Sequence, residues 1–143
     1  MNKSMGGGVA VYAAAAWFFA ASSLAAGALA VGVPPNVASD GFAYGRNVNS
    51  PDKDTASTRA LALCRSAHDS TDTARNLCTL VMAFEKQCVS VAMDPKAGTP
   101  GVGWAVAATK EEANSQALAN CRVTAGPTRQ DYCVTSDTAC DGQ

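Results

Sequence analysis

One cysteine-bearing segment occurs twice in the chain, and this repeat limits the possible folds more than any other feature. Residues 60–64 (ALALC) recur as residues 117–121 (ALANC) with four of five positions identical. An apolar run follows each copy, from Cys78 to Cys88 and from Cys133 to Cys140. Two copies are too few for a solenoid. The repeat therefore predicts two half-domains that share one core.

A helix is predicted in the second half around the repeated segment. Residues 109–112 (TKEE) form a capping box, in which the Thr109 hydroxyl accepts from the backbone N–H of Glu112 and the Glu112 carboxylate reaches back. Ala113, Ala117 and Cys121 then follow at helical spacing on one face. Gly126-Pro127 ends the helix.

A matching helix is predicted in the first half. Residues 50–52 (SPD) supply a cap, a proline at the first helical position and an acidic side chain in the first turn. Both helices use alanine for contact, which suggests close packing on a sheet. The predicted buried face consists of Ala56, Ala60, Leu63 and Cys64.

The strands follow from alternating apolar patterns. Residues 79–84 and 89–93 alternate on either side of three polar residues, which predicts a β-hairpin. Further strands are predicted at 42–44, at 104–108 and at 132–136. The order β-α-β-β-β-α-β predicts an α+β fold with a largely antiparallel sheet of about five strands and two helices packed on it. Its pseudo-two-fold halves are then β-α-β and β-β-α-β, held by three disulfides.

The N-terminal segment predicts export. Lys3 is the only charge before Asp40, residues 9–19 are apolar, and residues 28–30 (ALA) fit the small-x-small pattern of signal cleavage. We therefore expect a mature chain that starts at Val31. The predicted division is residues 1–30 as signal peptide, 31–40 as flexible N-terminal segment and 41–143 as the disulfide-stapled domain.

The alternative to a cleaved signal is an uncleaved membrane anchor, because the apolar run is long enough to span the hydrocarbon core. In both cases the rest of the chain is translocated. The expected location is extracytoplasmic, either in the periplasm or released from the cell.

All six cysteines lie beyond this segment, and an even number there indicates disulfides in an oxidising compartment. A zinc site needs close ligand pairs, whereas the shortest cysteine spacing is Cys133 to Cys140 and His68 is the only histidine. We expect no metal and no cofactor.

Six cysteines allow 15 connectivities, and a pattern that survives exchange of the two halves leaves seven. Short loops then favour Cys64–Cys78 and Cys121–Cys133, because each helix must return to the strand that follows it. The remaining bridge, Cys88–Cys140, is expected to tie the halves together.

The ordered motifs over residues 42–140 resemble those of the DUF4189 family of exported bacterial domains. One departure is at residues 50–54, which carry no counterpart of the family's Glu-Ala helix entry. The resemblance implies an exported α+β domain with paired cysteines and offers no catalytic residues to carry over. The matching segments are 60–64, 78–88, Val91-Ala92, Gly103-Trp104, Glu112-Ala113, 117–121 and Cys133-Val134.

The charges argue against nucleic acid as a partner. After residue 30 the chain has ten basic and twelve acidic side chains, and the basic ones are scattered. We expect no membrane contact after signal cleavage. The expected partner is a protein outside the cytoplasm, and the oligomeric state stays open.

Few residues suggest catalysis. His68 lies among serines and an aspartate in residues 66–70 (SAHDS), but there is no G-x-S-x-G motif, and we expect a solvated ring. Trp104 could stack on a ligand, although a core position is the expectation. No spacing brings together two carboxylates for glycosidase-type chemistry. The candidates are Glu85, Asp94, Glu111, Glu112 and Asp131.

The sequence therefore predicts no catalytic residues and favours a non-catalytic interaction module, one form of which is an inhibitor or effector. A rigid scaffold of this kind displays a loop, and residues 95–101 or 66–76 are the candidates. The alternatives are a small exported hydrolase and a purely structural envelope component.

Overall fold

The computed structural model describes residues 25–143, whose elements follow one another in two similar groups. The first group is β1 (Ala26–Gly32), α1 (Val37–Asp40), β2 (Ala43–Ser50), α2 (Lys53–Arg65), α3 (Asp72–Asn76) and β3 (Thr79–Phe84). The second is β4 (Cys88–Met93), β5 (Val102–Ala107), α4 (Lys110–Ala125), the 3-10 helix η1 (Gln130–Tyr132) and β6 (Val134–Cys140). Each group contains two strands, a long helix and a third strand.

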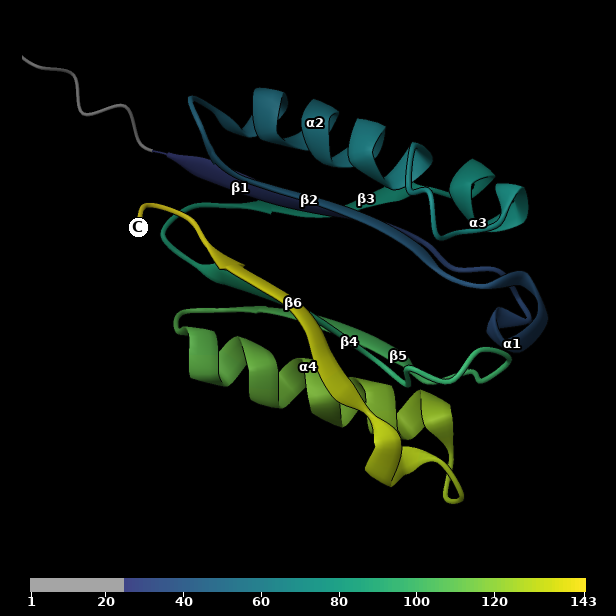
Figure 1. Cartoon of the computed structure of the whole chain (residues 1–143). Helices are drawn as coiled ribbons and strands as arrows, with labels where there is room; N and C mark the ends of the chain where they lie inside the picture. Colours follow the sequence, from purple (N-terminus) through teal and green to yellow (C-terminus); the bar gives the residue numbers. More distant parts are fainter. Residues whose placement is uncertain (1–24) are drawn as a thin grey trace, which may run out of the picture.

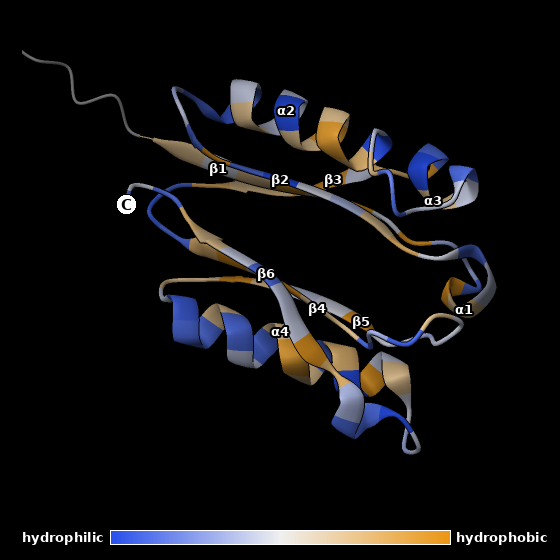
Figure 2. Cartoon of the chain, in the orientation of Figure 1, coloured by the Kyte–Doolittle hydropathy of each residue, from blue (hydrophilic) through white to orange (hydrophobic). Residues whose placement is uncertain are grey.

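The strands form two antiparallel sheets of three, in the orders β2-β1-β3 and β5-β4-β6. The sheets face each other, with α2 on the outer side of one and α4 on the outer side of the other (Figure 1). Hydrophilic residues lie on the outer helices α2 and α4 and also on α3 and the loops (Figure 2). The core between the sheets is built on the buried side chains of Leu29, Val31, Phe84, Val89 and Val91.

The two sheets share the same register at their centres, which makes the internal repeat structural, although β1 pairs with β2 across an irregularity between Ala26 and Ala28 that β4 and β5 lack. Ala30 of β1 pairs with Gly45, and Ala92 of β4 pairs with Gly103. The pairing of each central strand with its third strand is irregular at the same place, next to Ala30 and next to Ala92. Ala30 and Ala92 are therefore equivalent, and each half is a β-β-α-β unit.

The helices lie directly on glycines of the sheets. A Cβ atom at Gly45 would come closer than 3.0 Å to the backbone nitrogen of Cys64, and one at Gly103 would do the same at Cys121. The helix faces there consist of alanine and cysteine, as predicted, but Leu63, which was predicted on the buried face, is 48% exposed. The buried residues are Ala56, Ala60 and Cys64 in α2, and Ala113, Ala117, Cys121 and Ala125 in α4.

The helix ends agree with the predictions in part. The Thr109 hydroxyl accepts from the Glu112 N–H at 3.2 Å, but the Glu112 carboxylate accepts from Gln116 and does not reach back. Gly126 follows the end of α4 with a φ of 75°. In the first half the predicted start is wrong, because Ser50 ends β2 and Pro51 precedes the helix; the cap of α2 is Asp52, whose carboxylate accepts from the Thr55 N–H at 2.7 Å.

The α+β class is confirmed, but the single five-stranded sheet is replaced by two sheets, and the predicted hairpin is wrong. Strands β3 and β4 belong to different sheets, and the chain turns between them at Lys86, which has a φ of 53°. Alternation shows only that one face of a strand is buried. Facing sheets bury Phe84 and Val89 against each other's layer, whereas one sheet would leave that face open.

The predicted first strand at residues 42–44 is the second strand of the fold. Strand β1 precedes it, lies in the centre of its sheet and is buried along its whole length. The folded domain therefore begins at Ala26 and not at residue 41, and residues 31–40 include strand and helix. Small apolar residues suit both a cleavage region and a buried strand, so the sequence pattern did not separate the two.

The described residues, 25–143, include no helix of sufficient length and apolar character to cross a membrane. Most of the predicted signal segment, residues 1–24, lies outside the described part, so its cleavage stays a prediction.

All three predicted disulfides are present. They are Cys64–Cys78, Cys121–Cys133 and Cys88–Cys140. The last one does not tie the halves together, because it joins the paired strands β4 and β6 of one sheet. By register the counterparts of Cys88 and Cys140 in the first half are Ala26 and Glu85, which cannot form a bridge.

Besides the apolar core between the sheets, polar contacts near the C-terminus join the halves. The buried Asp141 carboxylate accepts from the backbone N–H groups of Asn49 at 2.9 Å and Lys86 at 3.1 Å. Both of these residues have positive φ angles. The Asn49 side chain in turn accepts from the Gly142 N–H at 2.8 Å. The carboxylate thus pairs two backbone N–H groups, one near the end of β2 in the first half and one in the linker between β3 and β4.

Candidate functional site

A groove of about 930 Å³ opens at the end of the sandwich where α1 lies beside the β4–β5 loop (Figure 1). Its walls come from residues 37–42, 66–71 and 93–99, and its floor from strands β2 and β6. The two loops that the sequence analysis proposed for display, 66–76 and 95–101, therefore contribute to the same groove from different halves. The sequence alone did not place them together.

The floor contains an ion pair between the halves. Arg46 of β2 donates from Nε and Nη2 to the two carboxylate oxygens of Asp137 on β6, at 2.7 and 2.8 Å. Both side chains are partly exposed, at 30% and 25%. The hydrogen bonds to Asp137 raise the pKa of Arg46 above its ordinary value. The pair fixes the relative position of β2 and β6 and leaves little uncompensated charge on the floor.

An aromatic row leads from the groove into the core. Phe42 stacks on Tyr44 at 5.9 Å and on Trp104 at 5.7 Å between ring centroids. Burial raises the pKa of the Tyr44 hydroxyl, and the neighbouring Asp137 carboxylate raises it further. Trp104 packs with the intersheet core, as expected, and also borders a second pocket of about 550 Å³ rimmed by Pro35 and Pro100.

A second ion pair holds the wall formed by the β4–β5 loop. Arg129 donates from Nε and Nη2 to the Asp94 carboxylate at 2.7 Å each, and Asp94 also accepts from the Lys96 N–H at 3.0 Å. The Asp94 side chain is fully buried, and the guanidinium lowers its pKa to about 2. Arg129 lies 4.0 Å above the Tyr132 ring, which holds the guanidinium from the other side.

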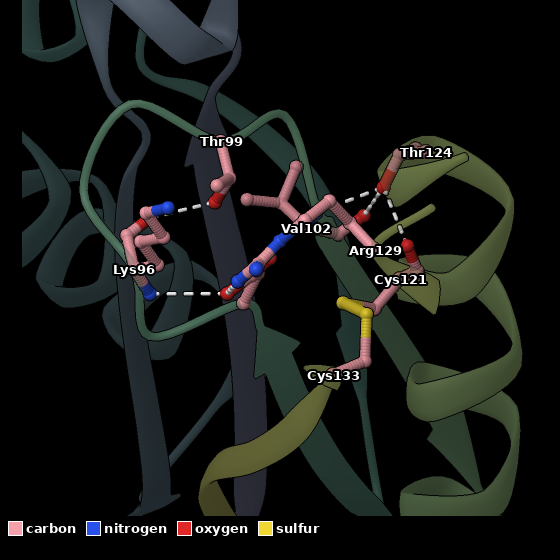
Figure 3. Close-up of a disulfide and its surroundings, with 8 residues drawn as sticks. Lys96, Thr99, Val102, Cys121, Thr124, Arg129 and Cys133 are labelled. Atoms are coloured by element: carbon pink, nitrogen blue, oxygen red, sulfur yellow. Dashed lines mark hydrogen bonds and ion pairs between the residues drawn. A yellow bond between two sulfur atoms is a disulfide. The ribbon is translucent and has the colours of Figure 1, made fainter. Parts of the chain in front are cut away.

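This wall is also fastened to α4. The Thr124 hydroxyl donates to the Val102 carbonyl at 2.7 Å and accepts from the Val102 N–H at 2.8 Å (Figure 3). The Cys121–Cys133 disulfide lies beside this contact and beside Arg129 (Figure 3). The base of the β4–β5 loop is therefore held by a hydroxyl and an ion pair, and the disulfide joins the two segments that carry Thr124 and Arg129.

The His68 ring is exposed at the rim of the groove, as predicted. The hydroxyls beside it are directed to backbone carbonyls. Ser66 donates to Ala62 at 2.9 Å, and Ser70 donates to Phe42 at 2.8 Å. These contacts close the helix end and anchor the loop, which is a structural use of both serines.

The five carboxylates considered for catalysis are not brought together. Of these, only Asp94 borders the groove, and Arg129 occupies both of its oxygens. Glu85 lies 3.6 Å from Lys53. The other three are exposed at the ends of elements: Glu111 and Glu112 in the first turn of α4, and Asp131 in η1.

The ion pairs at the groove are the feature that the sequence analysis missed. Arg46 and Asp137 are 91 residues apart, and Asp94 and Arg129 are 35 apart. Strand alternation could have placed Tyr44 and Arg46 on one face. Alternation does not indicate which distant side chains these two residues contact. Within residues 25–143, no three His, Cys, Asp or Glu side chains are grouped so as to hold a metal ion.

The comparison with protein families gives one match. The model described as a domain of unknown function, DUF4189, matches residues 26–140, from the first residue of β1 to the last residue of β6. No curated protein and no solved structure matches the chain.

Proposed function

The chain belongs to the DUF4189 family, and we propose that it is an exported, non-catalytic interaction module that binds a segment of an extracytoplasmic protein in its loop-lined groove. The observation that carries this proposal is the meeting of loops 66–71 and 93–99 over one floor. Inhibition of an extracytoplasmic enzyme is one form that such binding takes. The three disulfides are compatible with an oxidising compartment outside the cytoplasm.

The walls of the groove are held in place before any partner arrives. The Cys64–Cys78 bridge closes the segment that contains loop 66–71, and the Ser70 hydroxyl ties that loop to Phe42. The opposite wall is held by the Asp94–Arg129 pair. A preorganised surface loses little conformational entropy on binding, which raises affinity without additional contacts.

The chemistry of the groove suits a protein segment of mixed polarity. Arg46 and Arg129 are each bound to a carboxylate, so neither guanidinium offers a strong positive field for an anion or a nucleic acid. Exposed ionisable groups remain at the rim, namely His68, Asp69 and Lys96. Such a polar rim around a partly apolar surface is common at protein interfaces.

The test is partner capture followed by measured binding. The exported protein, purified with its disulfides intact, is immobilised and used to capture proteins from periplasmic extract and culture medium. The captured protein is then titrated against variants Asp69→Lys and Lys96→Glu at the rim. We expect each variant to weaken binding at least tenfold.

The matched control is a pair of charge reversals on the outer helix, Lys110→Glu and Glu111→Lys. These residues are exposed at the start of α4, away from the groove lining. Equal losses of affinity for rim and control variants would show that the partner does not bind in the groove. Hydrolysis of the captured partner by the wild-type protein would show that the protein is a hydrolase and not a non-catalytic interaction module.

A further inference from the structure

Strand β1 sets a limit on where the exported chain can be cut. All seven of its residues are buried, and it lies between β2 and β3 in the centre of its sheet. On one side Ala28, Leu29 and Ala30 pair with β2, and on the other side the same residues pair with β3. The strand is part of the folded domain along its whole length.

A cut after Ala30 would remove five of these seven residues. Val31 and Gly32 would remain, paired with Tyr44 and Ala43 at the start of β2. Neighbouring strands in a sheet lie about 4.8 Å apart, so β2 and β3 could not pair across the gap without moving together. The buried side chain of Leu29 would also be lost from the core between the sheets.

The second half shows what a complete unit contains. Strand β4, the counterpart of β1, is buried over nearly its full length and pairs with β5 and β6 from Cys88 to Met93. The equivalence of Ala30 with Ala92 makes Ala26 the counterpart of Cys88. A mature chain that starts at Ala26 therefore has two complete halves, whereas one that starts at Val31 has one.

The sequence before β1 offers a cleavage pattern at the required place. Residues 23–25 (SLA) have small side chains at the first and third positions, as signal peptidase requires, and follow the apolar run 9–19. We propose that the exported chain is cut between Ala25 and Ala26. Water adds across this peptide bond, leaving a carboxylate on Ala25 and an ammonium group on Ala26, which becomes the N-terminus of β1.

This inference rests on the export part of the proposed function but not on the groove. Its first test is the intact mass of protein that is expressed from Met1 in a bacterial host and recovered from periplasm or medium. We expect an N-terminus at Ala26. A start at Leu29 or Val31, a start before Ala26, or a chain that keeps Met1 in the membrane fraction would each overturn the proposal.

Two substitutions outside the folded strand make the test specific. Ala25→Leu places a large side chain at the position before the cut, and we expect the ratio of processed to unprocessed chain to fall at least tenfold. The matched control is Leu24→Phe at the unrestricted middle position, which is expected to leave the ratio unchanged. Normal processing of the Ala25→Leu variant at the same bond would contradict the assignment.

The structural premise is tested separately by attaching an unrelated cleavable signal to chains that start at Ala26 or at Val31. We expect the first to be recovered with three disulfides and the second to be degraded or recovered at least tenfold less. Equal recovery of both would show that β1 is dispensable and would remove the reason for the assignment. Neither result depends on whether a partner binds the groove.

Discussion

The two halves of the molecule share strand register, helix packing and a local disulfide, yet they differ at both ends of the central strand. At the start of the strand, the second half has the Cys88–Cys140 bridge, and the first half has Ala26 and Glu85 at the equivalent positions. At the end, the second half has the Asp94 carboxylate, and the first half has Gly32.

The second of these differences lies beside the groove. Asp94 binds Arg129, which is four residues before Cys133. Gly32 faces Ala74, which is four residues before Cys78, and a Cβ at Gly32 would come closer than 3.0 Å to the Ala74 carbonyl oxygen. One half thus uses an ion pair where the other uses direct backbone packing.

The comparison separates what the scaffold requires from what it leaves free. Both halves need a helix of small residues on a glycine-containing strand and a bridge from that helix to the next strand. The closure at the end of the central strand can differ, because an ion pair and a close backbone contact both hold the following loop. The groove is therefore asymmetric although the scaffold is nearly two-fold.

The largest effect is expected from loss of the bridge that only one half has. The double variant Cys88→Ser and Cys140→Ser opens a loop of 52 residues and is expected to lower the free energy of unfolding by about 4 kcal/mol. Denaturant unfolding measures the loss, and native-state hydrogen exchange locates it. We expect faster exchange in β4 and β6 with little change in β1. Equal acceleration in both sheets would contradict the assignment of this bridge to one half.

Next, the two local bridges are expected to be equivalent. Their separations are 14 and 12 residues, so removing Cys64–Cys78 or Cys121–Cys133 is expected to cost about 3 kcal/mol in each case. The measurement is denaturant unfolding of the two alanine double variants side by side. A difference of more than about 1 kcal/mol between them would show that the halves differ in energy where they agree in geometry.

The glycines under the helices give a third comparison. Gly45→Ala and Gly103→Ala each place a methyl group against the helix backbone and are expected to cost about 2 kcal/mol, within the usual range for overpacking. The check is the unfolding free energy of each variant. An unchanged unfolding free energy for one variant would mean that the helix and strand of that half can move apart slightly. The close packing would then be required only in the other half.

The ion pair of the second half predicts a dependence on pH. The folded-state pKa of Asp94 is lowered to about 2, so its contribution to stability is complete above its unfolded pKa of about 3.9 and is lost as pH falls through about 2. Asp94→Asn is therefore expected to be less stable than the wild-type protein at pH 7, and the difference is expected to shrink between about pH 4 and pH 2.

Unfolding measured across this pH range tests the prediction. Asp131→Asn serves as control, because Asp131 is exposed outside the pair, and its difference from the wild-type protein is expected to stay flat. A difference at Asp94 that does not change with pH would mean that the substitution acts through packing and not through the charge.

Much of this architecture could be predicted because it depends on local patterns. The Thr109 cap, the Gly126 stop and the alanine faces of the helices are set by neighbours in sequence. The disulfide pairing followed from the repeat together with short loop closure. The order of the strands and long helices from β2 onward is also as predicted, whereas α3, which lies in the predicted loop 66–76, and η1 were not predicted.

The errors arise where one local pattern fits two structures. Strand β1 consists of alanine, glycine, leucine and valine, a composition that also suits a cleavage region. The alternation in β3 and β4 fits both a hairpin and a pair of facing sheets. The groove depends on Arg46 meeting Asp137 and Asp94 meeting Arg129, and no local pattern in a single sequence reports such distant pairs.

The smallest effect on stability is expected at His68, because this exposed side chain borders the groove without packing in the core. The ring is exposed at the groove rim, and the neighbouring Ser66 and Ser70 hydroxyls are bound to backbone carbonyls. His68→Ala is expected to change the free energy of unfolding by no more than about 0.5 kcal/mol, as is usual for surface positions.

Binding of the captured partner is expected to weaken in the same variant, because His68 borders the groove in which we propose that the partner sits. Thr128→Ala, at an exposed position in the corresponding loop of the second half and outside the groove lining, is the matched control for both measurements. Unchanged binding together with unchanged stability would show that loop 66–71 is a plain connection. A loss of several kcal/mol in stability would show that the ring takes part in packing, and the rim would then belong to the scaffold.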